Sequence, residues 1–228
     1  MGRQTILIDA DDTLWENNIF FEQMIGRFLS GLTHLGFTPD YCRHILNETE
    51  RRNILQHGYG VRSFRRSLED TYLKLAGGMA RKEFVQEIEK MAGELERTPP
   101  QILEGVPETL AYLSGHHRLI LLSKGEAAEQ AAKVERSGLA RYFDAVEIVH
   151  EKDHATYERV VHQFKIVKSN GWMVGNSPRS DINPALRAGL NAVFIPHHAT
   201  WVLEHSELES GAGKLILVAS FRELRGHF

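Results

Sequence analysis

The chain has 228 residues, of which 42% are hydrophobic and 25% charged, and its formal net charge is −3. This length can form one sizeable core plus a smaller accessory domain, and the composition is that of an ordinary globular protein. The negative charge argues against a general nucleic-acid-binding surface. A single cysteine, Cys42, excludes an internal disulfide framework and fits a reducing compartment.

No apolar run approaches the ~20 residues that are needed to cross a bilayer. Residues 1–5 lead straight into a strand-like segment, which leaves no room for a signal peptide. We therefore expect a cytoplasmic protein without a membrane partner.

The first strand is predicted at Ile6–Ile8, a short apolar run that ends at a cluster of acids. The next ~80 residues show helical periodicity and no convincing strand. The helices predicted there are one that carries Phe20, Met24, Phe28 and Leu32 on one face, then Tyr41–Ile54 capped by Asp40, Phe64–Leu75 and Lys82–Leu95.

The Thr98-Pro99-Pro100 segment predicts a boundary, because two prolines cannot continue a helix. Beyond it strands alternate with helices, which predicts a mostly parallel sheet covered on both faces. The expected strands are Leu119–Leu122, Ala145–Val149, Trp172–Val174, Ala192–Ile195 and Leu215–Val218, and the expected helices are Pro107–Leu113, Ala127–Ser137, Tyr157–Phe164 and Pro184–Ala188. We therefore predict an α/β core domain of residues 1–14 and 101–228, with residues 15–100 as an all-helical cap domain.

Polar residues follow each of the first four predicted strands of the core, where open parallel sheets place their sites. These residues are Asp9, Asp11 and Thr13, then Ser123 and Lys124, then Lys152, and finally Asn176 and Asp181. Their convergence at one edge of the sheet would create a site that combines carboxylates, hydroxyls and ammonium groups.

Such a set suits phosphoryl transfer, which needs a nucleophile, a proton donor, neutralisation of phosphate charge and a cation. Asp9 can attack phosphorus, and Asp11 can protonate the leaving group and later activate water. Mg²⁺ prefers oxygen ligands, which predicts a metal site beside Asp9 and Asp181. Ser123 can donate a hydrogen bond to a phosphoryl oxygen, and Lys152 can offset negative charge.

Each position taken alone has a simpler explanation. Ser123 could cap the helix that follows Glu126, Lys152 could be a surface charge, and Asp181 could cap the helix at 182–188. The order of these residues, one group after each successive strand, favours the catalytic interpretation.

With these motifs, the chain resembles the haloacid dehalogenase-like (HAD) superfamily in its phosphatase branch. The segments that carry the resemblance are residues 6–14, 121–123, 151–153 and 175–190, and it extends from Ile6 to about Ile195. The resemblance implies a Rossmann-like three-layer core with a helical cap, dependence on Mg²⁺, and hydrolysis of a small phosphorylated metabolite through an aspartyl phosphate.

The resemblance also implies roles for individual residues. Asp9 would be the nucleophile and Asp11 the acid/base, with the backbone carbonyl of Asp11 on the metal. The phosphate site would use Thr13, Ser123, Lys124 and Lys152, and the metal site would use Asp9, Asp11, Asp181 and Asn176.

Asn176 departs from the pattern, because many phosphatases of this family have an acid at that position. Dehalogenating relatives can carry an asparagine there, although they generally lack the second aspartate, which is Asp11 here. Three alternatives remain at this point: a haloacid dehalogenase, a sugar-phosphate mutase that excludes water, and a non-catalytic domain of the same fold.

Substrate specificity is expected from the predicted cap and from the loop after the first strand, with Trp15, Tyr59 and Arg62 as candidates. The Gly58-Tyr59-Gly60 loop follows no strand, so it is not a nucleotide-binding glycine loop. Most of the twelve histidines are expected at the surface, because no Cys/His cluster has zinc spacing.

Overall fold

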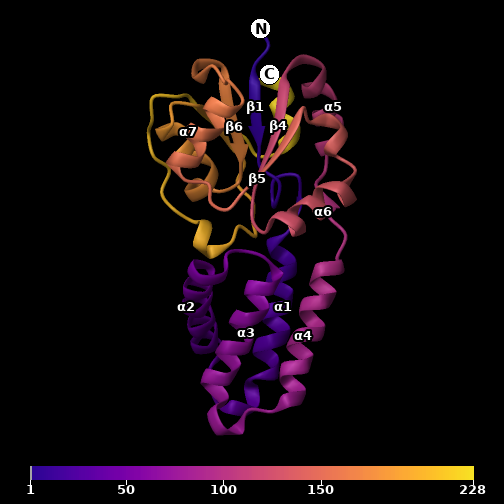
Figure 1. Ribbon diagram of the computed structural model, residues 1–228, viewed down its shortest axis with the longest axis vertical. Helices are drawn as coiled ribbons and strands as arrows, with labels where there is room; N and C mark the ends of the chain where they lie inside the picture. The colour runs from indigo at the N-terminus through magenta and orange to yellow at the C-terminus, as the bar shows by residue number, and fades with distance from the viewer. Residues whose placement is uncertain (1) are drawn as a thin grey trace. The chain divides into compact units, whose positions relative to one another are not determined.

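The computed structural model describes residues 2–228 and divides the chain into two compact units (Figure 1). The core unit is Met1–Asn18 together with Pro99–Phe228, and the helical unit is Ile19–Thr98. The chain therefore leaves the core unit after Asn18 and returns to it at Pro99, the first of the two prolines.

The core unit contains a six-stranded parallel sheet, which confirms the predicted α/β fold. Its strand order is β5-β4-β1-β6-β7-β8. The strands are β1 (Thr5–Ile8), β4 (Arg118–Lys124), β5 (Ala145–Val149), β6 (Gly171–Gly175), β7 (Asn191–Phe194) and β8 (Leu215–Leu217). Ile8 pairs with Leu121 on one side and Val174 on the other, so Asp9 follows β1 at the edge of the sheet where β4 ends at Lys124 and β6 ends at Gly175.

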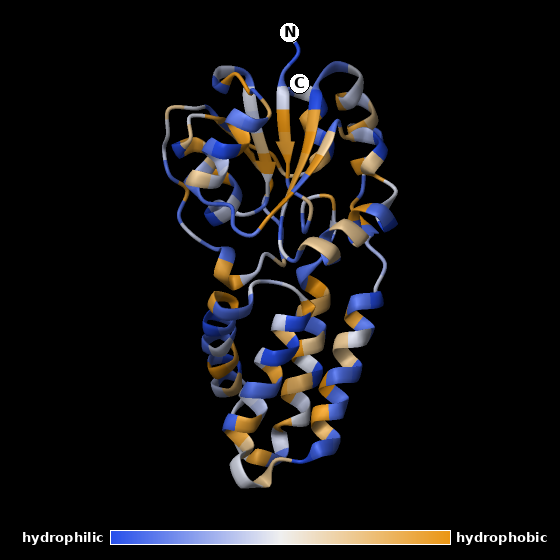
Figure 2. Cartoon of the chain, in the orientation of Figure 1, coloured by the Kyte–Doolittle hydropathy of each residue, from blue (hydrophilic) through white to orange (hydrophobic). Residues whose placement is uncertain are grey.

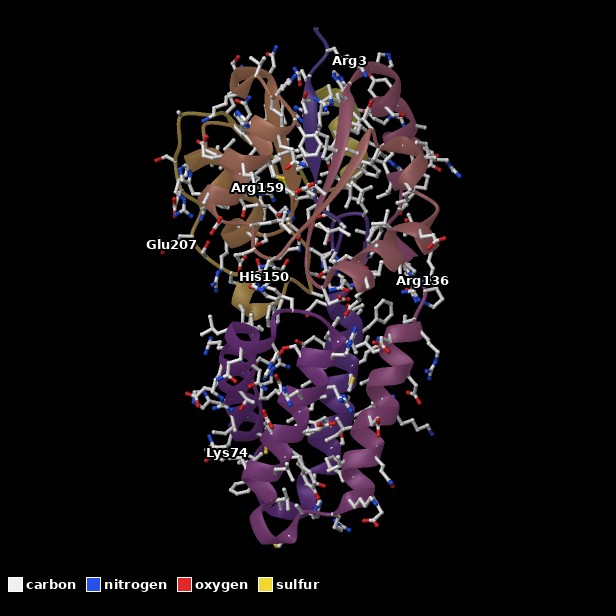
Figure 3. The ribbon with its side chains drawn as sticks, viewed as in Figure 1. Arg3, Lys74, Arg136, His150, Arg159 and Glu207 are labelled. Atoms are coloured by element: carbon white, nitrogen blue, oxygen red, sulfur yellow. The ribbon has the colours of Figure 1, made fainter. Side chains whose placement is uncertain are left out.

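Helices cover both faces of this sheet, because alternate strand residues point to opposite sides. Ile6 and Ile8 pack with α5 (Val106–His116) and α6 (Ala127–Ser137), whereas Leu7 packs with α7 (His154–Gln163) and α8 (Asn183–Arg187). The apolar strands run between these helices in Figure 2, and charged side chains such as Arg159 lie on the outside in Figure 3. The alternation of side chains along the strands thus accounts for the three layers, with helices on each face of the sheet.

The remaining elements of the core unit are short. A two-residue strand, β2 (Trp15–Glu16), pairs antiparallel with β3 (Gln101–Ile102), and neither was predicted. The other short helical segments of this unit are η3 (Ala140–Tyr142), η4 (Lys168–Asn170), η5 (Pro178–Ile182), η6 (Val202–Glu204) and η7 (Phe221–Gly226).

The start of α6 corrects one of the simpler explanations. The side chain of Glu126 accepts a hydrogen bond from the Glu129 amide at 2.8 Å, so Glu126 and not Ser123 caps this helix. Gly138 ends the same helix with φ of 68°, as its position predicted.

The helical unit is built from four helices packed around their own core. They are α1 (Asn18–Gly31), α2 (Pro39–His57), α3 (Val61–Ala76) and α4 (Lys82–Arg97), with single turns η1 (Thr33–Leu35) and η2 (Gly77–Met79). Met24, Phe28 and Leu32 are buried in this core, as their spacing predicted. The predicted cap at Asp40 is wrong, because Thr38 accepts the hydrogen bond from the Tyr41 amide and Asp40 lies inside the first turn.

Within residues 2–228 no helix has the length and apolarity that crossing a bilayer requires.

The helical unit buries one carboxyl group that lacks a cation of its own. Glu50 is 6% exposed, and its Oε2 has no hydrogen-bond partner among the described residues. The nearby Arg43 is bound instead by both carboxylate oxygens of Glu22, each at 2.7 Å. Burial raises the pKa of Glu50 to about 7, and the Arg43 charge opposes this shift only in part.

This raised pKa predicts a pH-dependent stability. The folded state holds the Glu50 proton up to about pH 7, whereas an ordinary glutamate releases it near 4.5. The stabilisation is therefore complete below pH 4.5 and is lost as the pH rises through 7. Glu50→Gln should remove up to roughly 3 kcal/mol of this dependence.

Thermal unfolding of both proteins at pH 5 and pH 8 measures the effect. The wild type should lose more stability than Glu50→Gln between the two pH values, and parallel losses would contradict the assignment.

Candidate active site

Asp9 follows β1 in a tight loop that fixes its carboxylate. Its amide continues the sheet by donating to the Val174 carbonyl at 2.9 Å, and the amides of Thr13 and Leu14 then donate to the Ala10 carbonyl. The Thr13 hydroxyl donates to Asp9 Oδ2 at 2.9 Å. The turn passes through Asp12 at φ of 61°, which an aspartate tolerates better than most residues.

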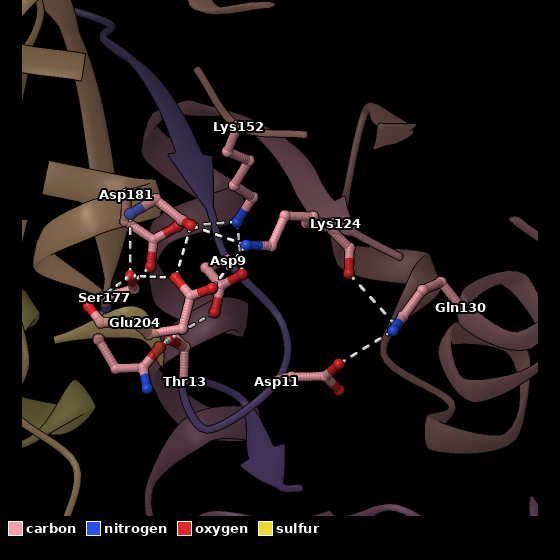
Figure 4. Close-up of polar contacts among 12 residues, drawn as sticks. Asp9, Asp11, Thr13, Lys124, Gln130, Lys152, Ser177, Asp181 and Glu204 are labelled. Carbon is pink, nitrogen blue, oxygen red and sulfur yellow. Dashed lines mark hydrogen bonds and ion pairs between the residues drawn. The ribbon is translucent and has the colours of Figure 1, made fainter. Parts of the chain in front are cut away.

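Lys152 joins the carboxylates of Asp9 and Asp181 in the interior of the core unit (Figure 4). Its Nζ lies 2.5 Å from Asp9 Oδ1 and 2.8 Å from Asp181 Oδ1. Lys152 is held just before α7, because Asp153 caps that helix by accepting from the Thr156 amide. The three predicted residues thus meet although they follow three different strands.

Burial and the charges in this cluster shift the pKa of the Asp9 carboxyl group and of the Lys152 ammonium group. Burial and the neighbouring Asp181 raise the pKa of Asp9 to about 7, against the opposing effect of Lys152. Burial alone would lower the pKa of Lys152, but the two carboxylates outweigh it and the pKa is raised. Two carboxylates share one ammonium here, which leaves an excess of negative charge.

The loop after β6 is shaped to bring Asp181 back to the sheet. A Cβ at Gly175 would overlap Oδ2 of Asp181, so only glycine leaves room for that carboxylate. Asp181 Oδ2 accepts from the Ser177 amide at 3.0 Å, and Ser177 itself caps the π-helical turn η5. Asp181 is therefore no cap for the following helix, which was the simpler explanation.

These oxygens fit a hard divalent cation. Asp9 and Asp181 provide the excess negative charge. The Asn176 amide oxygen, in the loop after β6, lies 3.4 Å from the Thr13 hydroxyl in the loop after β1. Asp9, Asp181, Asn176 and the backbone carbonyl of Asp11 would hold Mg²⁺.

A second group of possible metal ligands, Asp12, Glu16 and His197, escaped the sequence analysis. His197 Nε2 lies 3.2 Å from Glu16 Oε2, and its Nδ1 accepts from the Ala199 amide at 3.3 Å. A neutral ring that accepts at Nδ1 carries its proton on Nε2, although neither Nε2 nor Glu16 Oε2 has a hydrogen-bond partner among the described residues. This geometry accounts for His197 as an internal contact of the core unit, although the sequence placed most histidines at the surface.

Gln130 of α6 bridges the side chains of Asp11 and Ser123. The Ser123 hydroxyl donates to Gln130 Oε1 at 3.3 Å, and Gln130 Nε2 donates to Asp11 Oδ2 at 2.9 Å. Asp11 also accepts from Trp15 Nε1 at 2.7 Å and from Lys133 Nζ at 3.1 Å. Trp15, a predicted specificity residue, is only 1% exposed, so its indole serves to hold Asp11.

Lys124, a predicted phosphate ligand, is engaged by acidic side chains. Its Nζ lies 2.6 Å from Glu204 Oε1 and 3.3 Å from Glu151 Oε1. Burial would raise the pKa of Glu204, but Lys124 and the hydroxyls of Ser177 and Ser180 outweigh burial and lower it. Glu204 was missed, because nothing in the sequence marks one glutamate of a long loop as a partner of these motifs.

The other predicted specificity residues belong to the helical unit: Tyr59 lies in the loop between α2 and α3, and Arg62 lies in the first turn of α3. Tyr59 is partly buried and Arg62 is exposed. Their role in specificity stays a prediction.

The fold and the site define a hydrolase class. The family model of the haloacid dehalogenase-like hydrolases matches residues 4–189, and the chain belongs to that family. A solved structure of a haloacid dehalogenase-like family hydrolase from Xanthomonas campestris has a TM-score of 0.86 and 28% identity, covering 99% of this chain and 90% of that one.

Two further proteins are similar to this chain in sequence or in fold. Pyrimidine 5'-nucleotidase YjjG of Escherichia coli (strain K12) is 27% identical over 128 residues, which is 54% of this chain and 54% of the relative, so the match spans about half of each. L-2-haloacid dehalogenase from Xanthobacter autotrophicus has a TM-score of 0.65 at 18% identity, covering 97% and 96% of the two chains, and shows the shared fold alone.

Removal of the Lys152 ammonium tests the charge balance of the site. Lys152→Met leaves two buried carboxylates facing each other, and we expect a loss of about 3 kcal/mol in the free energy of unfolding at pH 8. Millimolar Mg²⁺ should restore part of this loss, because it replaces the missing positive charge.

Urea denaturation with and without Mg²⁺ provides the measurement. Lys214→Met, at an exposed position, is the matched control and should match the wild type. If Mg²⁺ did not change the free energy of unfolding of Lys152→Met, the proposed Mg²⁺ site would be contradicted.

Proposed function

We propose that this protein is a Mg²⁺-dependent phosphomonoester hydrolase that acts on a small phosphorylated metabolite through an aspartyl phosphate. The observation that supports this most is the pair Asp9 and Asp11, two residues apart but held in different surroundings. Asp9 lies in the buried cluster with Lys152, whereas Asp11 has its own donors in Trp15, Gln130 and Lys133. One carboxylate is thereby set up as nucleophile and the other as acid/base.

The proposed reaction has two steps. An oxygen of Asp9 attacks phosphorus and the ester bond breaks, while Asp11 gives a proton to the departing oxygen. Asp11 then takes a proton from water, which attacks the aspartyl phosphate and releases phosphate. Lys152 and the Ser123 hydroxyl offset and orient the phosphoryl oxygens. Mg²⁺, when bound, stabilises negative charge on the phosphoryl group.

The nucleotidase relative supports a phosphate ester as the bond that is cleaved, because half of this chain matches a protein that is named for that activity. The single cysteine, a buried free thiol, is consistent with the proposed cytoplasmic location.

A haloacid dehalogenase is the second candidate, and Asn176 favours it. An amide at this position is a weaker Mg²⁺ ligand than a carboxylate, and attack of Asp9 on carbon would need no cation. Asp11 argues against it, since halide leaves without a proton.

A direct comparison of substrates separates the two candidates. We expect release of 4-nitrophenol from 4-nitrophenyl phosphate in the presence of Mg²⁺, loss of this activity with EDTA, and no chloride release from 2-chloropropionate. Chloride release without phosphatase activity would establish the dehalogenase instead, and silence in both assays would favour a mutase or a non-catalytic domain.

The two aspartates should respond differently to amide substitution. Asp9→Asn should abolish turnover, because no other oxygen in the cluster can take its place, while the fold is retained. Asp11→Asn should lower kcat for a phosphate ester by 10²- to 10⁴-fold, roughly the contribution of a general acid.

Turnover and circular dichroism of both variants check this. Turnover by a folded Asp9→Asn protein at the wild-type rate would end the assignment of the nucleophile.

A further inference from the structure

Gln130 makes a contact that links two functional groups of the site. It is 4% exposed, and its amide lies between the Ser123 hydroxyl and the Asp11 carboxylate. A glutamine carries an acceptor and a donor on one rigid amide, so Oε1 can accept from Ser123 while Nε2 donates to Asp11. Displacement of one contact must therefore disturb the other.

The loop after β4 is built to leave space for this side chain. Gly125 has φ of 152°, which side-chain-bearing residues rarely adopt. A Cβ at Gly125 would lie 2.8 Å from Gln130 Nε2 and 3.0 Å from its Cγ. Gly125 thus allows Gln130 to pass between α6 and the end of β4.

The neighbouring turn of α6 supports the same carboxylate. Lys133 lies three positions after Gln130, which places both on one face of the helix. Its Nζ contacts both Asp11 oxygens, at 3.1 and 3.2 Å, and the Asn17 side chain at 2.8 Å. Figure 4 shows Asp11 directed toward Gln130 and away from the group formed by Asp9, Lys152 and Asp181.

We propose that Gln130 is a positioning residue that couples phosphate binding at Ser123 to the position of Asp11. The Ser123 hydroxyl has one proton, so it cannot donate to a phosphoryl oxygen and to Gln130 Oε1 at once. Phosphate binding then removes one of the two contacts that fix the Gln130 amide. The amide, now held by Asp11 alone, turns and keeps its Nε2 contact, and it guides that carboxylate toward the leaving-group oxygen.

This inference rests on the proposed phosphatase function. In it, Asp11 acts as the acid only after a phosphoryl group has bound at Ser123. An unoccupied site keeps Asp11 on α6.

Leaving-group dependence is the kinetic readout. Gln130→Met keeps the length of the side chain but removes both contacts. It should lower kcat for phenyl phosphate about tenfold more than for 4-nitrophenyl phosphate, because 4-nitrophenolate departs without a proton. KM should stay within about twofold of the wild type for both substrates, since Gln130 does not touch the phosphate in this proposal.

A second variant separates the two contacts. Gln130→Glu keeps an acceptor for Ser123 but places a carboxylate against Asp11, and we expect at least the same selective loss on phenyl phosphate. Gln163→Met, an exposed glutamine of α7, is the matched control and should behave as the wild type. Equal slowing on both substrates, or no slowing, would overturn the coupling.

Crystals of the wild type with Mg²⁺ and inorganic phosphate provide a test that requires no turnover. We expect phosphate on the Ser123 hydroxyl, the contact between Ser123 and Gln130 Oε1 broken, and the Gln130 amide and Asp11 displaced together toward the phosphate. Phosphate on Ser123 with the Gln130 amide and Asp11 still in the positions that they hold here would contradict the coupling but not the proposed function. Phosphate that avoids Ser123, together with no turnover of either ester, would contradict the proposed function and the coupling with it.

Discussion

The contact of the Lys152 ammonium with two buried carboxylates is the constraint on which the site depends. Asp9 and Asp181 could not share a water-excluded space without it, because two like charges there repel strongly. The contact in turn requires the ends of β1, β5 and β6 to come to one edge of the sheet. The strand order β5-β4-β1-β6 places β1 in the middle, so that loops from both sides can reach Asp9.

The surroundings of the two N-terminal aspartates divide the site into different environments. The Asp9 side is buried and dominated by ion pairs, whereas the Asp11 side is lined by neutral and cationic donors of α6 and by an indole. This division comes from the tight loop after β1, which turns successive side chains in different directions within a few residues. A single short segment can therefore provide two carboxylates with separate chemical tasks.

Much of this architecture could be predicted from the sequence, because buried parallel strands leave strong apolar runs with polar residues at their ends. Ala127–Ser137 and Ala145–Val149 were predicted with their observed bounds, and Asp9, Lys152 and Asp181 were expected to meet. Gln130 and Glu204 were not predicted, since a helix residue or a loop residue gains its role only from the folded geometry. The strands β2 and β3 are too short to show any periodicity. The cap at Thr38 was missed, because Asp40 is also a residue type that caps helices and lies closer to the predicted helix start.

The pairing of β2 with β3 has a consequence for how the chain accommodates its helical unit. Trp15 faces Ile102 and Glu16 faces Gln101, so the outgoing and returning segments are already joined side by side within the core unit. The entropy cost of closing the chain between these two strands grows only slowly with the length of the insertion. The core unit can thus accommodate insertions of different lengths between these two strands while the loop after β1 remains anchored.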